Sequence, residues 1–265
     1  MERFTIFAKK DALSQNIANK IIRAFKAAGR IIDDVNPELC IVIGGDGKML
    51  RAVHQYLDRI NEMYFVGILT GTLGFSSDYK ASEVDLFIKE ALTNVYTVKA
   101  KNLLQIELTK KDRSKKTYYA LNEFRVENRV HTCVLDVFIN DQLFEEFRGN
   151  GMIVSTPFGS TAYNRSLGGA IIFDHLDAFQ LTEVAGIHHT SYSSIGNSLI
   201  ISNNNKLTIK IQDTHQSLLG LDHLIIPSDG IVEVEIGLCD RTVNFIHYHP
   251  ITCVDRLKKA YIRDK

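Results

Sequence analysis

The chain has 265 residues, 45% of them hydrophobic, so it can bury a sizeable core as one large domain or two ordinary ones. Its 31 lysines and arginines balance 31 aspartates and glutamates, which favours neither nucleic acid nor an anionic membrane as a partner. No segment approaches the ~20 apolar residues that a membrane-spanning helix needs, and the N-terminal apolar run is too short for a signal peptide. We expect a cytoplasmic protein whose four scattered cysteines are free thiols.

The first 95 residues alternate strand-like and helix-like patterns. Residues 3–8 are predicted to form a strand, and Asp11 is placed to cap a helix with apolar residues at helical spacing, which Gly29 would end. The later elements continue the alternation: strand 39–43, helix 48–59 after a glycine turn, strand 64–69, the turn 70–74, and helix 83–92 with Ser82 as its cap and Asp85 three residues on. This order predicts a doubly wound α/β domain over residues 1–95, with both glycine turns at the carboxyl ends of strands, where such sheets bind ligands.

From residue 96 the pattern changes to short runs rich in β-branched residues. The predicted strands are 103–108, 117–121, 133–139, 142–147, 152–155, 207–211, 232–236 and 243–248. Asn140-Asp141 is a predicted hairpin turn between two of them. We therefore expect a β-rich domain over 96–250, a cleft between the two halves, and a C-terminal segment, 251–265, whose helix 254–262 returns to the first half.

The sequence Gly44-Gly45-Asp46-Gly47 follows an apolar strand and precedes a helix-like stretch. Glycines let a phosphate approach the main chain, and a carboxylate among them can orient a hydroxyl, accept its proton or face a divalent cation. This combination indicates phosphoryl transfer; the alternative is a tight turn that merely needs glycine. Neither a Walker P-loop nor a G-x-G-x-x-G fingerprint is present.

A second glycine- and hydroxyl-rich segment runs from Arg148 to Ala170. A strand breaks at Pro157, and a short helix is expected to follow. Ser160, Thr161 and the helix-start amides can bind phosphate or ribose oxygens, and Tyr163 offers a ring for base stacking. A ligand-binding loop is favoured over the alternative, an ordinary capped loop.

Three motifs resemble those of the NAD kinase family in order and spacing, nearly over the whole chain: Gly44 to Gly47, Leu121-Asn122-Glu123, and Ser155 to Asn164. The first is shared with 6-phosphofructokinases and with diacylglycerol and sphingosine kinases, whereas the other two are specific to NAD kinases. The resemblance implies an N-terminal α/β domain, a β-sandwich-like C-terminal domain and a site between them. It implies transfer of the γ-phosphoryl of ATP to the adenosine-ribose 2′-hydroxyl of NAD, with Mg²⁺, giving NADP.

The resemblance also implies residue roles. Asp46 matches the catalytic aspartate, a base for the 2′-hydroxyl, and no residue matches a dedicated metal ligand. The phosphate side matches Gly44, Gly45 and Gly47, with Lys48 beside them. The dinucleotide contacts match Phe75, Asn122, Glu123, Thr161, Ala162, Tyr163, Ser166, Ala185, Ile187 and His223. A homodimer or homotetramer is implied, in which Arg148, Asn150 and Ile187 face a neighbour's site.

Three positions depart from the family pattern. Lys48 stands where threonine is usual, and it either contacts ATP phosphate or is solvated. Asn150 replaces an aspartate and cannot carry its charge, and Phe158 replaces a small polar residue. These departures motivate one alternative, a dinucleotide-binding sensor without catalysis. The other alternative is a sugar or lipid kinase that shares only the glycine–aspartate turn.

Overall fold

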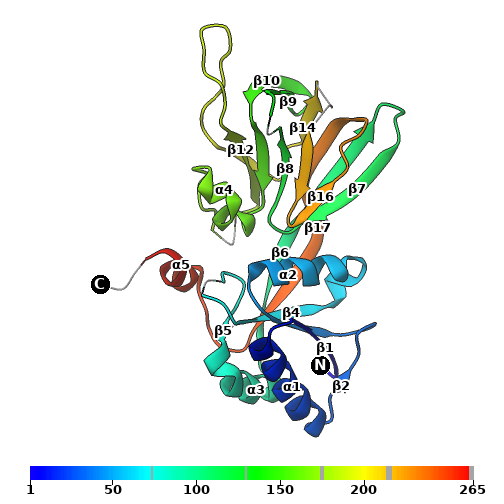
Figure 1. Cartoon of the computed structure of the whole chain (residues 1–265), viewed down its shortest axis with the longest axis vertical. Coiled ribbons are helices and arrows are strands. Elements are labelled where there is room, and N and C mark those ends of the chain that lie inside the picture. The colour runs from blue at the N-terminus through cyan, green and yellow to red at the C-terminus, as the bar shows by residue number, and fades with distance from the viewer. Residues whose placement is uncertain (73, 129, 174–175, 213–216, 263–265) are drawn as a thin grey trace. The chain divides into compact units, whose positions relative to one another are not determined.

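The computed structural model describes residues 1–72, 74–128, 130–173, 176–212 and 217–262 (Figure 1). Residue 73 of the predicted 70–74 turn and the last three residues of the predicted 251–265 segment lie outside these ranges. The chain forms two compact units, Met1–Lys101 with Arg241–Lys265, and Asn102–Asp240. The boundaries between them fall inside the long strands β6 (Thr97–Lys110) and β17 (Ile231–His247).

The first unit is built on a parallel sheet. Its strands lie in the order β5 (Tyr79–Lys80), β4 (Tyr64–Leu69), β3 (Leu39–Ile43), β1 (Arg3–Ala8) and β2 (Ile31–Ile32), and the end of β17 also pairs with β4. Parallel neighbours need crossover connections, and helices supply those from β1 to β2 and from β3 to β4. The helices are α1 (Ala12–Ala27), α2 (Asp46–Gln55), α3 (Val84–Thr93) and α5 (Cys253–Tyr261), with 3₁₀ turns η1 (Leu57–Glu62) and η2 (Ala81–Glu83).

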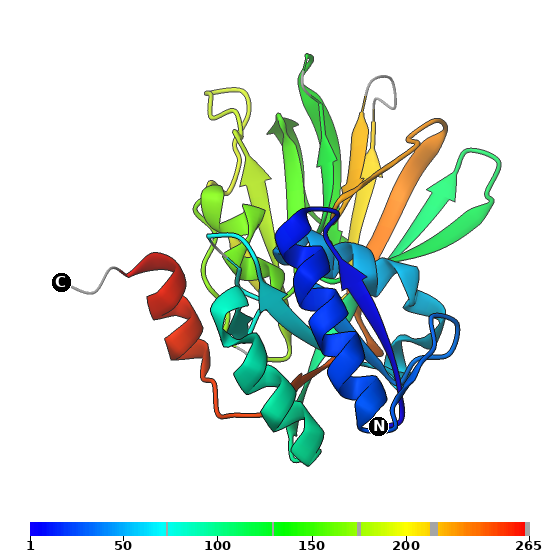
Figure 2. The ribbon, with the colours of Figure 1, turned by 60° about the horizontal axis from the view of Figure 1, so that its bottom comes forward.

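Helices α1 and α3 lie side by side on one face of this sheet (Figure 2). Ile21 and Phe25 of α1 and Phe87 of α3 form one buried cluster with Ile41 of β3. Cys40 and Val42 alternate with the clustered residues of β3 and are buried on the opposite face, where α2 packs. The predicted doubly wound arrangement is confirmed, because the sheet is parallel and covered on both faces.

Several element ends differ from the prediction. Helix α1 is capped as predicted, since Asp11 accepts a hydrogen bond from the Ser14 amide at 2.9 Å. The second helix begins at Asp46 rather than at 48, because Gly45 has the extended conformation of an N-cap. Ser82 does not cap α3: the N-cap is Glu83, whose carboxylate accepts a hydrogen bond from the Lys80 amide at 2.7 Å.

The second unit consists of two antiparallel layers. One sheet has the order β13 (Leu199–Ser202), β12 (Ala178–Val184), β11 (Gly151–Ser155), β8 (Glu123–Glu127), β15 (Leu218–Leu221) and β16 (Leu224–Ile226). The other contains β10 (Gln142–Gly149), β9 (Cys133–Ile139), β14 (Leu207–Ile211), β17, β6 and β7 (Lys115–Ala120). Between β11 and β12 the chain forms η3 (Gly159–Thr161) and α4 (Tyr163–Ser166).

Apolar residues from both sheets form one cluster in this unit. Phe124 and Val126 of β8 belong to it together with Leu135 and Val137 of β9. The expected β-sandwich-like architecture is therefore confirmed. The predicted strands 232–236 and 243–248 are a single strand, β17, because the intervening residues continue the extended backbone. The Asn140-Asp141 turn is confirmed, with φ of 52° and 64°.

Candidate active site

The glycine turn lies at the carboxyl end of β3 and begins helix α2. A Cβ on Gly44 would lie 2.9 Å from the Lys48 Cβ, so the turn has no room for a side chain there. Gly45 is the N-cap and provides no side-chain cap. Asp46 is therefore the first helical residue, placed at the positive end of the helix dipole.

The Asp46 carboxylate is held by the chain that follows β4. The Phe75 amide donates to both oxygens, at 3.0 Å to Oδ1 and 2.9 Å to Oδ2. The Ser76 amide and hydroxyl both donate to Oδ1, at 2.9 and 2.6 Å. Oδ1 thus accepts three hydrogen bonds from the described residues and Oδ2 accepts one. Because Asp46 is half-buried, Oδ2 retains capacity for a further hydrogen bond or a proton.

Lys48 lies in the first turn of α2, and its ammonium is 4.1 Å from the centre of the Phe7 ring. Burial lowers the pKa of Lys48, and the positive charges of Arg51 and Lys10 lower it further. Arg51 and Lys10 therefore both repel the Lys48 ammonium. An anion bound there would relieve this repulsion.

In the second unit, Asp222 fixes the Asn122-Glu123 pair. Its carboxylate accepts hydrogen bonds from the amides of Leu121, Asn122 and Glu123 at 2.9, 2.7 and 3.1 Å. Asp222 lies in the turn between β15 and β16 with φ of 48°, followed by His223. His223 thus lies in a turn beside this pair.

The side chains of Asn122 and Glu123 are buried without full hydrogen bonding. Asn122 Oδ1 and Glu123 Oε2 have no partner among the described residues. Burial, and then the Asp222 and Glu127 carboxylates, raise the pKa of Glu123 to about 8, although Arg125 opposes this shift. At neutral pH the Glu123 carboxyl can therefore carry a proton, so it can donate a hydrogen bond as well as accept one. Buried polar atoms without partners indicate a ligand-binding position.

The segment after β11 packs directly on this pair. The Thr156 amide donates to the Asn122 carbonyl at 2.9 Å, and the Thr156 hydroxyl donates to the Leu121 carbonyl at 2.6 Å. A Cβ on Gly159 would lie 2.0 Å from the Asn122 carbonyl oxygen. The Asn122-Glu123 pair and the segment from Ser155 to Asn164 are thus one hydrogen-bonded assembly.

Asn164 anchors the end of this segment. Its Oδ1 accepts hydrogen bonds from the Gln180 amide group at 3.0 Å and from the Thr182 hydroxyl at 2.8 Å. Asn164 is fully buried, so its position in the motif serves the loop structure. Thr161, Ala162 and Tyr163 are half-buried between this anchor and Gly159, and Ser166 is exposed.

Asn150 and Tyr163 line a cavity of about 450 Å³ together with Arg125, Glu127, Asn128 and Val184. The Tyr163 hydroxyl donates to Glu127 Oε1 at 3.1 Å, and the Arg125 guanidinium lies 5.8 Å from the Tyr163 ring centre. Arg125 also pairs with Glu127 at 3.2 Å. The cavity offers an aromatic face, a cation, a carboxylate and two amide side chains, a set that suits a nucleotide.

Arg148 lines a different cavity, of about 520 Å³, where its guanidinium lies 4.6 Å from the centre of the Tyr192 ring. The carbonyl of Arg148 accepts a hydrogen bond from the Ile187 amide at 2.8 Å. Ala185, with φ of 47°, and Ile187 are exposed on the loop after β12. Arg148 and Asn150 thus line separate cavities.

The structure distributes the predicted residues between the two units. Asp46, its three glycines, Lys48 and Phe75 lie in the first, and the other predicted contacts lie in the second. Ser76, Asp222, Arg125 and Glu127 were not predicted. Only Asp222 had a sequence signal, an acid followed by His223 between two apolar runs.

Comparison with known proteins decides the family. A model of the ATP-NAD kinase C-terminal domain matches residues 121–248. "NAD kinase 1" of Listeria monocytogenes is 35% identical over 263 residues, 99% of this chain and 100% of that protein. "NAD kinase 1" of Bacillus anthracis is 32% identical over 264 residues, with coverage of 99% and 100%. The chain belongs to the NAD kinase family.

Two solved structures show the NAD kinase fold of this chain. The yeast NADH kinase complexed with NADH superposes with a TM-score of 0.84 at 19% identity, covering 97% of this chain and 86% of that one. An NAD kinase from Archaeoglobus fulgidus in complex with ATP gives 0.77 at 20% identity, covering 97% and 99%.

The described residues contain no group of three or more histidines, cysteines, aspartates or glutamates that could hold a metal ion. As expected, no disulfide forms among Cys40, Cys133, Cys239 and Cys253. Within the described part of the chain, no helix has the length and apolar character to cross a membrane.

Proposed function

We propose that this protein transfers the γ-phosphoryl group of ATP to the adenosine-ribose 2′-hydroxyl of NAD, giving NADP, with Asp46 as the general base. The observation that carries the role of Asp46 is the geometry of its carboxylate. Four hydrogen bonds from Phe75 and Ser76 fix it at a helix N-terminus, and Oδ2 accepts only one of them from the described residues. A base held in this way needs little reorganisation before it accepts a proton.

The proposed step is balanced as follows. Asp46 Oδ2 accepts the proton of the 2′-hydroxyl as the ribose oxygen forms a bond to the γ-phosphorus. The bond between that phosphorus and the bridging oxygen of ADP breaks, and ADP leaves with its electron pair. The general base contributes ~10²–10⁴ in rate, and positioning of the two substrates supplies most of the remainder.

The first unit provides the charges that suit the donor. Lys48 lies in the first turn of α2, directly after the glycine turn, and Arg51 and Lys10 lie close enough to lower its pKa. A triphosphate would offset their repulsion. Mg²⁺ commonly takes one or two carboxylates together with substrate phosphates, so a single acidic residue fits a cation that arrives with ATP. Such a cation would neutralise charge on the transferred group.

The second unit provides groups that suit the dinucleotide. Asn122 Oδ1 and the Glu123 carboxyl are buried and have unused hydrogen-bonding capacity. An amide acceptor beside a carboxyl that can carry a proton matches the amino group and ring nitrogen of adenine. Tyr163 offers a ring face, and Arg125 offers positive charge for phosphate.

A product assay tests this function. Purified protein with NAD, ATP and Mg²⁺ is expected to form NADP and ADP in equal amounts, measured by a coupled dehydrogenase and by chromatography. Parallel reactions with polyphosphate as donor, and with NADH as acceptor, define the substrate preference. Absence of NADP with every donor would overturn the proposal.

The same assay distinguishes the alternatives. Turnover of fructose 6-phosphate, a sphingoid base or diacylglycerol, without turnover of NAD, would indicate a sugar or lipid kinase. Saturable NAD binding without any product would indicate a sensor. The buried assembly of Asn122, Glu123 and Gly159 argues against a sugar or lipid acceptor, because it joins the two NAD kinase-specific motifs.

We also propose that the protein acts in the cytoplasm as a homo-oligomer. Phe144, Tyr192 and Ile195 line the cavity beside Arg148 and are exposed, as is nearby Ile187. An exposed apolar group around an arginine–tyrosine stack is typical of protein interfaces. Light scattering tests this, since a monomer has a mass of 29.9 kDa.

A further inference from the structure

The peptide group between Phe75 and Ser76 connects Asp46 to the C-terminal helix. Its N–H, which belongs to Ser76, donates to Asp46 Oδ1 at 2.9 Å. Its C=O, which belongs to Phe75, accepts a hydrogen bond from Arg256 Nη1 in α5. Because a peptide group is planar, a contact that fixes the carbonyl also fixes the direction of the N–H. A charged donor on the carbonyl also polarises the amide and strengthens its N–H as a donor.

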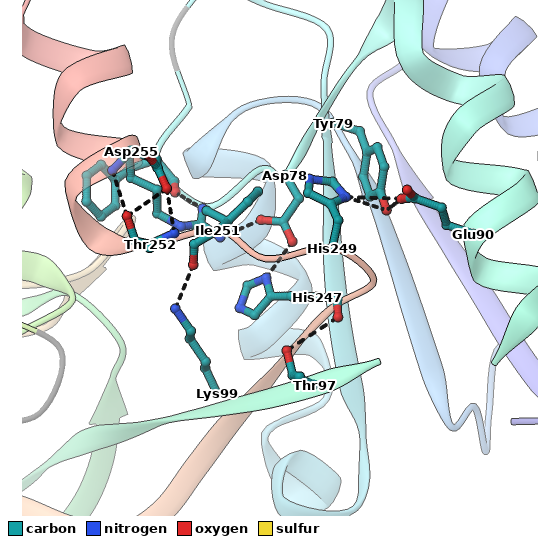
Figure 3. Close-up of polar contacts among 12 residues, drawn as sticks. Asp78, Tyr79, Glu90, Thr97, Lys99, His247, His249, Ile251, Thr252 and Asp255 are labelled. Carbon is teal, nitrogen blue, oxygen red and sulfur yellow. Dashed lines mark hydrogen bonds and ion pairs between the residues drawn. The ribbon is translucent and has the colours of Figure 1, made fainter. Parts of the chain in front are cut away.

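Arg256 is itself held in place. Its Nη2 donates to Asp78 Oδ1, and the other oxygen, Oδ2, is 2.5 Å from His247 Nδ1. Figure 3 shows Asp78 joined to His247. Burial would raise the pKa of Asp78, but the hydrogen bond from His247 and the charge of Arg256 outweigh it and keep the pKa below its ordinary value. Asp78 is therefore the anionic partner that orients the guanidinium.

The start of α5 is fixed by polar contacts (Figure 3). Thr252 accepts a hydrogen bond from the Asp255 amide at 3.1 Å, and Asp255 accepts one from the Thr252 amide at 2.9 Å, which forms a capping box. Lys99 Nζ donates to the Ile251 carbonyl at 2.8 Å. These contacts set the position from which Arg256 reaches the Phe75 carbonyl.

The burial of α5 is unusual for a helix that serves mainly to fill a core. None of its residues is fully buried, whereas the Asp78 side chain that pairs with Arg256 is only 3% exposed. A buried ion pair contributes little net stability, because desolvation offsets its attraction. The ion pair between Arg256 and Asp78 therefore suits a role in orienting the Arg256 guanidinium.

We propose that Arg256 is a positioning residue for phosphoryl transfer, acting through the Phe75–Ser76 peptide group to orient the Asp46 carboxylate. The proposal rests on the function of Asp46 stated above. Without Arg256 the peptide group can rotate, the Ser76 N–H leaves Oδ1, and the carboxylate no longer presents Oδ2 in one direction.

The test compares Arg256→Ala and Arg256→Lys with Lys258→Ala, which removes an exposed cation from the same helix. Arg256→Ala is expected to lower kcat ~10–100-fold with the KM for NAD changed less than threefold, because misplacing a catalytic group costs turnover more than binding. Arg256→Lys is expected to lose less, and millimolar guanidinium is expected to restore part of the Arg256→Ala rate. Lys258→Ala is expected to match the wild type.

A double-mutant cycle shows whether Arg256 acts through Asp46. In the Asp46→Asn background, Arg256→Ala is expected to cause no further loss of kcat, because the group that it orients is already gone. An equal loss in both backgrounds, or an unchanged kcat in Arg256→Ala, would overturn the inference. If Arg256→Ala does not fold, Arg256→Lys in the same cycle decides.

These outcomes separate the two claims. Full activity of Asp46→Asn would refute the role of Asp46 itself, whatever Arg256 does. A large loss in Asp46→Asn with no loss in either folded Arg256 variant would refute only the role of Arg256.

Discussion

At the scale of single residues, the sequence identifies chemical groups more readily than their partners. The expected role for Asp46 came from its three glycines and the family resemblance, both visible in one short segment. Its donors, Phe75 and Ser76, lie 29 and 30 residues away, and three of the four hydrogen bonds come from main-chain amides. Main-chain donors leave no signal in residue identity, so these contacts needed the structure.

Glu123 also acquires its properties from the fold. The motif predicted a pocket residue, but the raised pKa results from burial and from Asp222, which lies 99 residues further on. The motif therefore predicted that this carboxyl lies in a pocket, but it did not predict its protonation state.

The pKa of Glu123 predicts a pH dependence of stability. Its folded-state pKa, about 8, exceeds the ordinary value of 4.5, so between these pH values the folded protein holds a proton that the unfolded chain releases. The free energy of unfolding should therefore fall as pH rises through this window. Glu123→Gln cannot titrate, so from pH 5 to pH 8.5 it should lose less stability than the wild type, by ~2–4 kcal/mol. Urea unfolding at several pH values measures this.

The two proteins are compared by the slope of the free energy of unfolding against pH. Their absolute stabilities are not compared, because glutamine can change stability by an amount that is the same at every pH. The exposed Glu146 provides a control, and Glu146→Gln should follow the wild-type curve. Parallel curves for Glu123→Gln and the wild type would contradict the assigned pKa.

At the scale of elements, hydrophobic periodicity predicted most helices and strands, whereas local capping determined their ends. Strands 3–8, 39–43 and 64–69 have the predicted bounds, because each is a short apolar run between turn residues. Helix α2 starts two residues earlier than predicted, since Asp46 itself occupies the first turn. The single strand β17 was divided in the prediction because Gly237 and Asp240 disfavour strands.

The loop after β11 predicts the effect of one substitution. Gly159 lies so close to the Asn122 carbonyl that a Cβ would be 2.0 Å from its oxygen, and a backbone atom cannot easily move aside. Gly159→Ala should lower the free energy of unfolding by ~1–3 kcal/mol. Urea unfolding measures this loss of stability. The KM for NAD should also rise, because the added methyl group displaces Asn122, and steady-state kinetics measure that rise.

Gly237→Ala in β17 is the matched control, since a Cβ there meets no atom within 4 Å. It should change stability by less than ~0.5 kcal/mol. Equal stability of the two variants would show that the Gly159 contact does not constrain the motif.

At the scale of the whole molecule, the basic and acidic residues balance, so no net positive charge attracts anions. A bound phosphate must therefore be neutralised by cations close to it. The structure provides them in both units, as Lys10, Lys48 and Arg51 in one and Arg125 in the other. The architecture of both units was predictable, because parallel α/β and antiparallel β patterns differ in periodicity and the family motifs fix their order. The contact of Arg256 in α5 with the Phe75 carbonyl was not predictable, since it joins segments 181 residues apart.

The central claim is that the Asp46 carboxylate accepts the proton of the attacking hydroxyl, and Asp46→Asn tests it most directly. The amide keeps the shape of the side chain but is not a base at neutral pH. With saturating NAD, ATP and Mg²⁺, kcat for NADP formation should fall ~10²–10⁴-fold, while calorimetry shows NAD binding within threefold of the wild type. NADP formation by folded Asp46→Asn at the wild-type rate would contradict the account.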